Sequence, residues 1–459
     1  MSTLITRWEP DNRAFWDLEG ARVARRNLAL SVPPLVLAFA VWSLWSAAVV
    51  YLPHAGFVFT TDELFWLAAL PALGGATLRV VYAFMVPIFG GRRWTAVSTA
   101  LLVVPAAGFG LAVQNPDTGF GTFALLALAC GLGGGHFASS MANVSFFFPR
   151  SQQGTALGLS AGLGNLGVSL AQFVVPLAVA GALFGVPQEW AQAGEARHLW
   201  LHNAGFVWVP FILVAAAAAW FGMNDLAPVR ASLGEQAVVF RRPDAWRLSW
   251  LYLGTFGSFM GYSAGLPLLI ASQYPHVNPL NSVWLGPLVG ALIRPVGGWL
   301  ADGLGAARVT FWNFVVMALA TLGVLFFIPA TAGTEDGFHG FLAMFMVLFI
   351  AAGIGNGAVF SLIPRVFAAL HQRAARAAEP GEGRDTHVAS REAAAVLGLA
   401  SAVGAYGGFF IPGSYGTAIT LTGGPAAALW LFVAFYVTCI AIAGGYLFRD
   451  RRAAPSEWS

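Results

Sequence analysis

Two arginines stand inside long apolar stretches of the chain, where a charged side chain is costly. Arg79 lies in the run 63–89 and Arg294 in the run 281–301. An arginine at the centre of a membrane helix costs roughly 2.5–3.5 kcal/mol on insertion scales. Two such costs require compensation, which an internal carboxylate, a set of backbone carbonyls or waters, or a bound anion could supply.

An anionic ligand is the compensation that the sequence favours. No Asp or Glu occurs at the middle of any apolar run, and the nearest candidate, Asp302, falls at the end of the run that contains Arg294. A guanidinium offers planar, forked donors that match a planar oxyanion, and it stays charged at physiological pH. We therefore predict that Arg79 and Arg294 bind a small anion, with a purely structural role as the alternative.

The composition indicates which solvent surrounds these arginines. Of 459 residues, 58% are hydrophobic and 10% are charged, whereas soluble proteins carry about 25% charged residues. An apolar run of about 20 residues crosses the roughly 30 Å of bilayer hydrocarbon. We predict an all-α membrane protein with twelve transmembrane helices, at 29–53, 63–89, 94–114, 120–148, 152–183, 203–222, 248–272, 281–301, 308–330, 340–370, 388–420 and 424–448.

Arginines gather in alternate connections between these runs. One set of connections and the two terminal segments carry almost all of them, and the opposite set carries mostly Asp and Glu, with Arg197 as its one arginine. Because arginine-rich connections stay in the cytoplasm, we predict that both termini are cytoplasmic. The expected organisation is an N-terminal segment 1–28, a six-helix half 29–222, a linker 223–247, a second half 248–448 with a mobile loop 371–390, and a tail 449–459.

The two halves resemble each other in three pairs of segments. Gly75 to Arg79 matches Gly290 to Arg294, GLGGG at 131–135 matches GIGNG at 353–357, and 162–176 matches 398–412. Such pairs predict a duplicated six-helix unit, so two pseudo-symmetric halves with a binding site between them near the midplane. Helix packing alone explains most of the glycines.

Enzyme chemistry finds no support in the sequence. Cys130 and Cys439 both lie in apolar runs, which predicts neither a disulfide framework nor a cysteine metal site. The chain has no lysine and therefore no standard phosphate-binding loop. We expect no metal, no cofactor and no nucleic-acid partner.

Charged residues flank glycine turns at the ends of two runs. Asp302 and Arg308 flank one turn, and Gly90-Gly91-Arg92-Arg93 occupies the corresponding place in the first half. This pattern resembles the loop between the second and third helices of each major facilitator half. The resemblance implies a conformational latch, and an ordinary charged turn at a helix end is the alternative.

A specific resemblance covers nearly the whole chain. The segments GGGHFASSMANVSFFFPRSQQGTALG at 133–158, GLGNLGVS at 162–169 and AVGAYGGFFIP at 402–412 resemble NarK-type nitrate/nitrite porters of the major facilitator superfamily, as do RNLALSVP at 26–33 and YLGTFGSFMGYSAGLP at 252–267. The resemblance implies the major facilitator fold. It also implies roles for further residues: substrate arginines at Arg79 and Arg294, an aromatic pair around the anion at Phe137 and Phe256, hydrogen-bonding groups at Asn165 and Tyr252, and close-packed glycines at Gly134 and Gly164.

Two residues depart from the family pattern. His136 stands where many members have asparagine, and we expect a neutral polar neighbour of the site rather than a titrating group. Tyr406 stands at a position that is often aliphatic in the family, and could narrow a gate at either face.

The expected function is nitrate/nitrite antiport by alternating access in a bacterial inner membrane. Two unpaired arginines repel each other when the site is empty, which disfavours closure without an anion, and no carboxylate within a span is available to carry a proton. Proton-coupled nitrate symport, a porter for nitrite alone or formate, a gated small-anion channel and a membrane sensor are the alternatives. We expect a monomer with a functional link to a cytoplasmic-side nitrate reductase, in nitrate assimilation or respiration.

Overall fold

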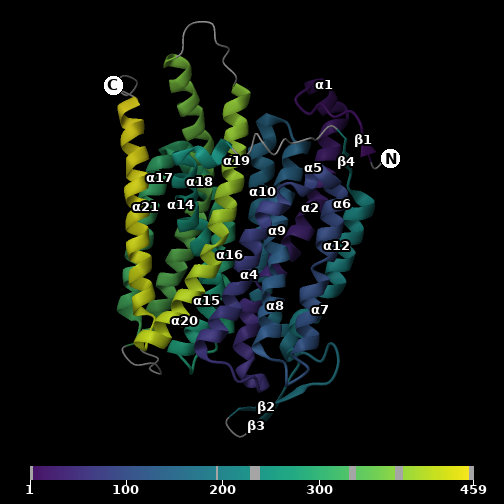
Figure 1. The fold of residues 1–459 in the computed structure, drawn as a ribbon, viewed down its shortest axis with the longest axis vertical. Coiled ribbons are helices and arrows are strands. Elements are labelled where there is room, and N and C mark those ends of the chain that lie inside the picture. The colour runs from purple at the N-terminus through teal and green to yellow at the C-terminus, as the bar shows by residue number, and fades with distance from the viewer. Residues whose placement is uncertain (1–3, 193–194, 228–237, 330–336, 378–385, 454–459) are drawn as a thin grey trace.

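The computed structural model describes residues 4–192, 195–227, 238–329, 337–377 and 386–453, and it is almost entirely helical (Figure 1). Twelve helical segments of this described part are long and apolar enough to cross a membrane. The prediction of twelve spans is therefore confirmed, and the helices form two groups of six that lie side by side.

Helices of the first half follow the predicted runs. The structure contains α1 (Arg13–Phe15), a π-helical turn η1 (Trp16–Gly20), α2 (Ala21–Trp42), α3 (Leu44–Ala48), 3-10 turns η2 (Val49–Tyr51) and η3 (Pro53–Ala55), α4 (Thr61–Tyr82), α5 (Met85–Phe89), α6 (Gly91–Ala100), α7 (Val103–Ala112), α8 (Phe120–Ala129), α9 (Gly131–Phe147), α10 (Arg150–Ala180), α11 (Asn203–Phe206) and α12 (Trp208–Gly222).

The second half has the same order of spans. Its elements are η4 (Val238–Arg241), α14 (Pro243–Tyr252), a π-helical turn η5 (Leu253–Gly257), α15 (Ser258–Gln273), η6 (Pro279–Asn281), α16 (Leu285–Leu304), α17 (Ala306–Phe327), α18 (Phe338–Ala377), α19 (Thr386–Ala405), α20 (Gly407–Thr422) and α21 (Ala426–Ala453).

Two small sheets mark opposite ends of the molecule. β1 (Leu4–Ile5) pairs in parallel with β4 (Asp225–Leu226) beside the N-terminus, at the end of the molecule where the C-terminus also lies. β2 (Gln188–Gln192) and β3 (Glu195–Leu199) form an antiparallel hairpin at the other end. Figure 1 shows the chain termini at one end and this hairpin at the other, as an even number of spans requires.

The first helical stretch begins earlier than the sequence indicates. Residues 1–28 were expected to form a polar segment, yet helix starts at Arg13. Trp16, Val23 and Ala24 explain this start because they pack against Phe147 and Phe148 in a separate small core. Burial of these apolar side chains stabilises the helix although the stretch also carries many charged residues.

Parts of two predicted connections fall outside the described residues. Within the expected linker 223–247, residues 228–237 are not described, and α14 begins at Pro243. Within the expected loop 371–390, residues 378–385 are not described, while α18 continues to Ala377 and α19 begins at Thr386. The last residues of the expected tail 449–459, from 454 onward, also fall outside.

Local sequence signals fix the helix that carries Arg79. α4 begins after Thr60, whose hydroxyl accepts a bond from the Glu63 backbone N–H, while the Glu63 carboxylate accepts one from the Thr60 N–H. This reciprocal capping box satisfies donors that a helix start otherwise leaves unpaired. Pro71 lies within the helix, and its carbonyl oxygen accepts a bond of 2.7 Å from the Trp42 indole N–H.

Candidate anion site between the two halves

Arg79 is buried and is held by two backbone carbonyls. Its side chain projects from α4, and the residue is 1% exposed. Nε donates to the Gly134 carbonyl in the same half at 2.9 Å, and Nη1 donates to the Ser401 carbonyl in the other half at 2.7 Å. The remaining nitrogen, Nη2, has no hydrogen-bond partner among the described residues. The carbonyls therefore position the guanidinium and leave one donor nitrogen available.

Three aromatic rings surround the same guanidinium. Its central carbon lies 5.2 Å from the ring centroid of Trp42, 4.6 Å from that of Phe137 and 5.0 Å from that of Phe256. Such contacts stabilise a cation through the ring quadrupole and exclude water from it. They do not neutralise its charge.

Arg294 lies in α16 of the second half and is also buried, with 5% exposure. Its Nη2 donates to the Tyr252 hydroxyl at 3.3 Å, and its guanidinium carbon lies 5.1 Å from the Phe360 ring centroid. Nη1 has no hydrogen-bond partner within the described part of the chain. Each half therefore contributes one arginine with an unused donor.

A row of stacked rings joins the two arginines. Tyr252 and Phe256 stack with centroids 5.4 Å apart and an interplanar angle of 13°. Phe256 and Phe137 face each other across the interface between the halves at 6.4 Å and 25°. The Arg79 guanidinium contacts Phe256 at one end of this row, and Arg294 bonds to Tyr252 at the other. The structure thus brings together Arg79, Arg294, Phe137, Phe256 and Tyr252, which the sequence analysis placed in one site.

Within the described part of the chain, no carboxylate lies beside these two guanidiniums. Asp225 is the one acidic residue that is buried among those the structure describes, and it lies beyond α12, where it pairs with Arg92 at 3.2 Å. Neither Arg79 nor Arg294 forms an ion pair with a described residue.

Asn165 lies on the face of α10 that contacts the other half. Ser169 and Gln172, one and two turns further along this face, donate to the carbonyls of Trp284 and Ser263 at 2.8 and 2.6 Å. Asn165 itself is 1% exposed, and neither its amide oxygen nor its amide nitrogen has a partner among the described residues. The expected hydrogen-bonding role of Asn165 towards the anion stays a prediction.

The predicted close-packed glycines leave no room for a side chain, Gly134 because of a neighbouring backbone and a ring, and Gly164 because of the Leu35 side chain. A Cβ on Gly134 would lie 2.6 Å from Gly75 Cα and 2.7 Å from the Trp42 ring, and a Cβ on Gly164 would lie 2.6 Å from Leu35 Cδ2. Real Cβ atoms do not come this close to neighbouring atoms. The absence of a side chain at Gly134 also lets its carbonyl oxygen reach Arg79.

The His136 side chain bonds to α6 and has no hydrogen bond to either arginine among the described residues. Gly134 and His136 are two residues apart on α9 and so lie on roughly opposite sides of the helix. The His136 Nδ1 atom forms a hydrogen bond of 3.0 Å with the Ser98 hydroxyl on α6, and Nε2 has no partner among the described residues. This placement favours a neutral neighbour of the site over a proton carrier.

Replacement of His136 by asparagine is accordingly expected to leave anion transport within about twofold of the parent, because an amide can keep one bond of ordinary strength to Ser98. Initial transport rates between pH 6 and 8 provide the measurement. A change in the shape of the pH profile in His136→Asn, but not in the exposed variant His339→Asn, would indicate that His136 titrates during transport.

Tyr406 lies at the junction of α19 and α20, and its hydroxyl is 3.1 Å from the Thr77 hydroxyl on α4. The bond connects the two halves at a position two residues before Arg79 on the same helix, about half a turn away and so on a different face of α4. Tyr406 therefore lies at the edge of the interface rather than in contact with either guanidinium.

The expected latch residues have partners that their sequence positions do not reveal. Asp302 pairs with Arg365 at 2.6 Å, whereas Arg308 is exposed and forms no ion pair with the described residues. Arg92 and Arg93 both approach Asp225, at 3.2 and 3.6 Å. The Asp302–Arg365 pair joins α16 to α18, and the pairs with Asp225 join α6 to the strand β4 that follows α12. Asp225 and Arg365 were missed because they are far away in sequence from their partners.

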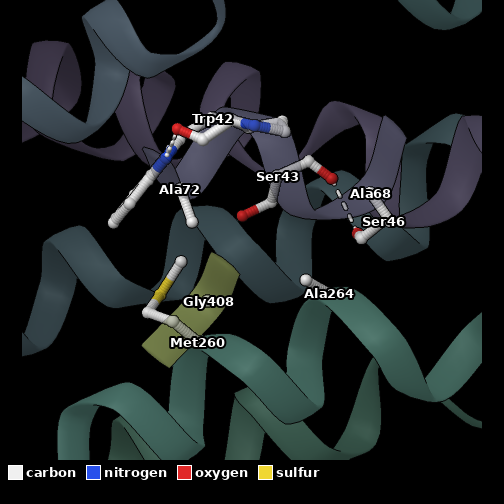
Figure 2. A pocket seen from close by; sticks show the side chains of 9 residues that line it. Trp42, Ser43, Ser46, Ala68, Ala72, Met260, Ala264 and Gly408 are labelled. Atoms are coloured by element: carbon white, nitrogen blue, oxygen red, sulfur yellow. Dashed lines mark hydrogen bonds between the residues drawn. The ribbon is translucent and has the colours of Figure 1, made fainter. Parts of the chain in front are cut away.

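The halves meet tightly at the end with the β2–β3 hairpin, which we call the closed end. There α4 packs against α20, with ring contacts between Phe65 and Tyr415 and between Trp66 and Phe409. Figure 2 shows a cavity at this interface, lined from both halves by residues that include Ser43, Ala72, Met260 and Gly408. Its volume is about 10 Å³, which is roughly the space of one water molecule.

The same interface is uncovered towards the end with the chain termini, which we call the open end. Gly162, Gly158 and Gly154 continue the α10 face of Asn165, Ser169 and Gln172, yet a Cβ at any of the three would meet nothing within 4 Å. The same is true of Gly398 on α19. Asn165 and the arginines therefore lie between a packed end and an uncovered end.

Comparisons with known proteins agree with this architecture. The sequence profile of the Major Facilitator Superfamily matches residues 34–378. A solved bacterial homologue of the human lysosomal transporter Spinster, in an inward-facing and occupied conformation, superposes with a TM-score of 0.63 at 15% identity, covering 94% of this chain and 98% of that chain. At this identity the likeness concerns the fold alone.

Two sequence relatives are much more similar. The nitrate/nitrite transporter NarU of Salmonella typhimurium strain LT2 is 48% identical over 443 residues, which are 95% of this chain and 94% of the relative. The probable nitrate/nitrite antiporter NarK2 of Thermus thermophilus is 39% identical over the same shares of both chains. With its twelve spans, the chain is a multi-pass protein of the bacterial inner membrane and a transporter rather than an enzyme. It belongs to the NarK-type nitrate/nitrite porters of the Major Facilitator Superfamily.

Proposed function

We propose that this protein exchanges nitrate for nitrite across the inner membrane, holding one anion at a time between Arg79 and Arg294. The observation that carries the proposal is the pair of buried arginines, each with an unused donor nitrogen and no carboxylate partner among the described residues. The relatives named for nitrate and nitrite support the identity of the anion. Both arginines belong to one chain, so a monomer suffices.

The aromatic pair suits a flat anion. Carbon atoms in contact lie about 3.5–4.0 Å apart, so one planar group between two rings needs a separation of roughly 7 Å. The Phe137 and Phe256 centroids are 6.4 Å apart, and a small opening of the rings admits such a group. Nitrate and nitrite are both planar and singly charged, which allows one site to bind either.

Exchange follows from the unpaired charges. In the described conformation the helix faces at the open end are uncovered while the residues of the anion site are buried, and the arginine-rich connections predict that this end faces the cytoplasm. Moving to the opposite conformation requires the open end to close around two guanidiniums. A bound anion offsets their repulsion, whereas an empty site retains it, so return without an anion is disfavoured. Nitrite from a cytoplasmic-side nitrate reductase would leave as nitrate enters, in assimilation or respiration.

The deciding experiment uses purified protein in liposomes loaded with nitrite and supplied with external nitrate. We expect nitrate uptake to match the loss of internal nitrite, and to fall to the level of protein-free liposomes when no internal anion is present. Uptake driven by an inward proton gradient without internal nitrite would instead identify a nitrate/proton symporter. A steady anion conductance without counter-flow would identify a channel.

A further inference from the structure

Asn356 is a buried amide for which the described protein provides no partner. It lies in α18, it is 1% exposed, and neither its amide oxygen nor its amide nitrogen forms a hydrogen bond with a described residue. Burying an amide without hydrogen bonds is costly, so such groups in native proteins almost always have a partner. The only other asparagine in which both amide atoms are left in this way, within the described residues, is Asn165.

The position of Asn356 on α18 places it beside Phe256. Phe349, Asn356 and Phe360 are spaced by seven and four residues and so share one helix face. At one end of this face Phe349 contacts Phe259 with centroids 6.2 Å apart, and at the other end Phe360 contacts Tyr252 at 5.6 Å.

The Phe256 ring is stacked between the rings of Tyr252 and Phe259, the two residues that α18 contacts. Its ring centroid lies 5.4 Å from that of Tyr252 and 6.4 Å from that of Phe259. Because Asn356 occupies the middle of the facing stretch of α18, it lies at the level of Phe256.

The residues on either side of Asn356 confirm this level. A Cβ on Gly355 would clash with the Thr255 side chain, which precedes Phe256 in the chain. A Cβ on Gly357 would clash with the carbonyl oxygen of Arg294. The glycine before Asn356 therefore packs against Thr255, next to Phe256, and the glycine after it packs against the backbone of Arg294.

The internal repeat shows what is particular about Asn356. Aligning GLGGG at 131–135 with GIGNG at 353–357 sets Asn356 opposite Gly134. Gly134 holds Arg79 through its carbonyl oxygen at 2.9 Å. The corresponding position of the second half carries an amide side chain, whereas the first half has a glycine there. Helix packing does not explain this difference.

We propose that Asn356 contacts the transported anion and donates its Nδ2–H to an anion oxygen, as a second amide that acts together with Asn165. This inference rests on the proposed anion site and adds a determinant of selectivity to it. The available donors would then be one nitrogen of each arginine and one amide from each half.

Nitrate requires more of these hydrogen-bond donors than nitrite does. Nitrate has three oxygens that point in three directions, and two arginines cannot approach all of them. Nitrite has two oxygens and can turn both towards the arginines. Loss of an amide donor therefore leaves a nitrate oxygen without a partner in a buried site, where an unmet hydrogen bond costs most. Asn356 accordingly favours nitrate over nitrite.

The test compares Asn356→Leu with the parent in nitrate and nitrite exchange, with Asn356→Ser as a second variant if the leucine fails to fold. We expect the KM for nitrate to rise about tenfold, the value for a lost bond to a charged group, and the KM for nitrite to change less than about threefold. The stabilisation of purified protein by each anion, read as a shift in Tm, should show the same order.

Asn313→Leu is the matched control. Asn313 is another buried amide of the same half, but its Nδ2 has a partner, because it donates to Met317 Sδ at 3.5 Å and lies beside Gly355 of α18. This variant is expected to lower Tm without changing the ratio of the two KM values. An unchanged ratio in both Asn356 variants would overturn the inference, whereas a parent protein that exchanges neither anion would overturn the proposed function instead.

Discussion

Replacement of Arg79 by lysine is expected to reduce nitrate exchange at least about 100-fold, because one ammonium group cannot replace three nitrogens that act in different directions. Nε and Nη1 of Arg79 are used by the carbonyls of Gly134 and Ser401, and Nη2 remains for the anion. A lysine keeps the charge, but it must give up either the carbonyls that position it or the anion. Exchange in nitrite-loaded liposomes is the measurement.

Arg294→Lys is expected to have an effect of similar size for a related reason. Arg294 uses Nη2 on the Tyr252 hydroxyl and retains Nη1. Arg13→Lys is a suitable control, since this side chain is 96% exposed and lies outside the interface. Exchange at the parental rate in both Arg79→Lys and Arg294→Lys would show that charge alone suffices and would remove the argument from guanidinium geometry.

The energetic signal of these arginines explains why the sequence was sufficient to find them. A charge within an apolar run is conspicuous whatever the fold, and the repeat placed both charges in corresponding spans. Phe137 and Phe256 gave no such signal, because aromatic residues are common in membrane helices, and only the resemblance singled them out. Trp42 and Phe360, which also contact the guanidiniums, were missed for the same reason.

The sequence could not predict contacts made by backbone carbonyls, or ion pairs between residues that are far apart in the chain. The carbonyl of Ser401 contacts Arg79 across the two halves, and a carbonyl belongs to every residue type alike. Asp302 follows Arg294 closely in sequence, but its partner Arg365 comes from a different helix. Asn356 did carry a signal, because it is the position where the second glycine-rich motif departs from the first.

The closed end offers a test of alternating access that does not touch the anion site. Gly408 on α20 faces α4 of the other half, and a Cβ on Gly408 would lie 2.7 Å from Ala72 Cβ. Figure 2 shows both residues beside the cavity at the interface. The cavity, at about 10 Å³, is too small for a larger side chain. Any bulk added at Gly408 must therefore separate the halves at this end.

Gly408→Leu is expected to reduce exchange by at least about tenfold while the protein stays folded, because the described conformation becomes the disfavoured one of two states. Accessibility of a cysteine introduced at Gly158 reports the change. In the described conformation this position is uncovered, and it should react more slowly when the closed end is held apart. Both native cysteines, Cys130 and Cys439, are buried, so they contribute little background labelling.

The neighbouring glycine distinguishes this effect from simple damage. A Cβ on Gly407 would clash with Gly257 of the same half, rather than with the other half. Gly407→Leu is therefore expected to lower Tm and expression without slowing cysteine labelling at position 158 in the protein that does fold. If Gly408→Leu instead exchanged anions at the parental rate with unchanged labelling, the packed interface between α4 and α20 would not be a gate. Transport would then have to proceed without separation of the halves at that end.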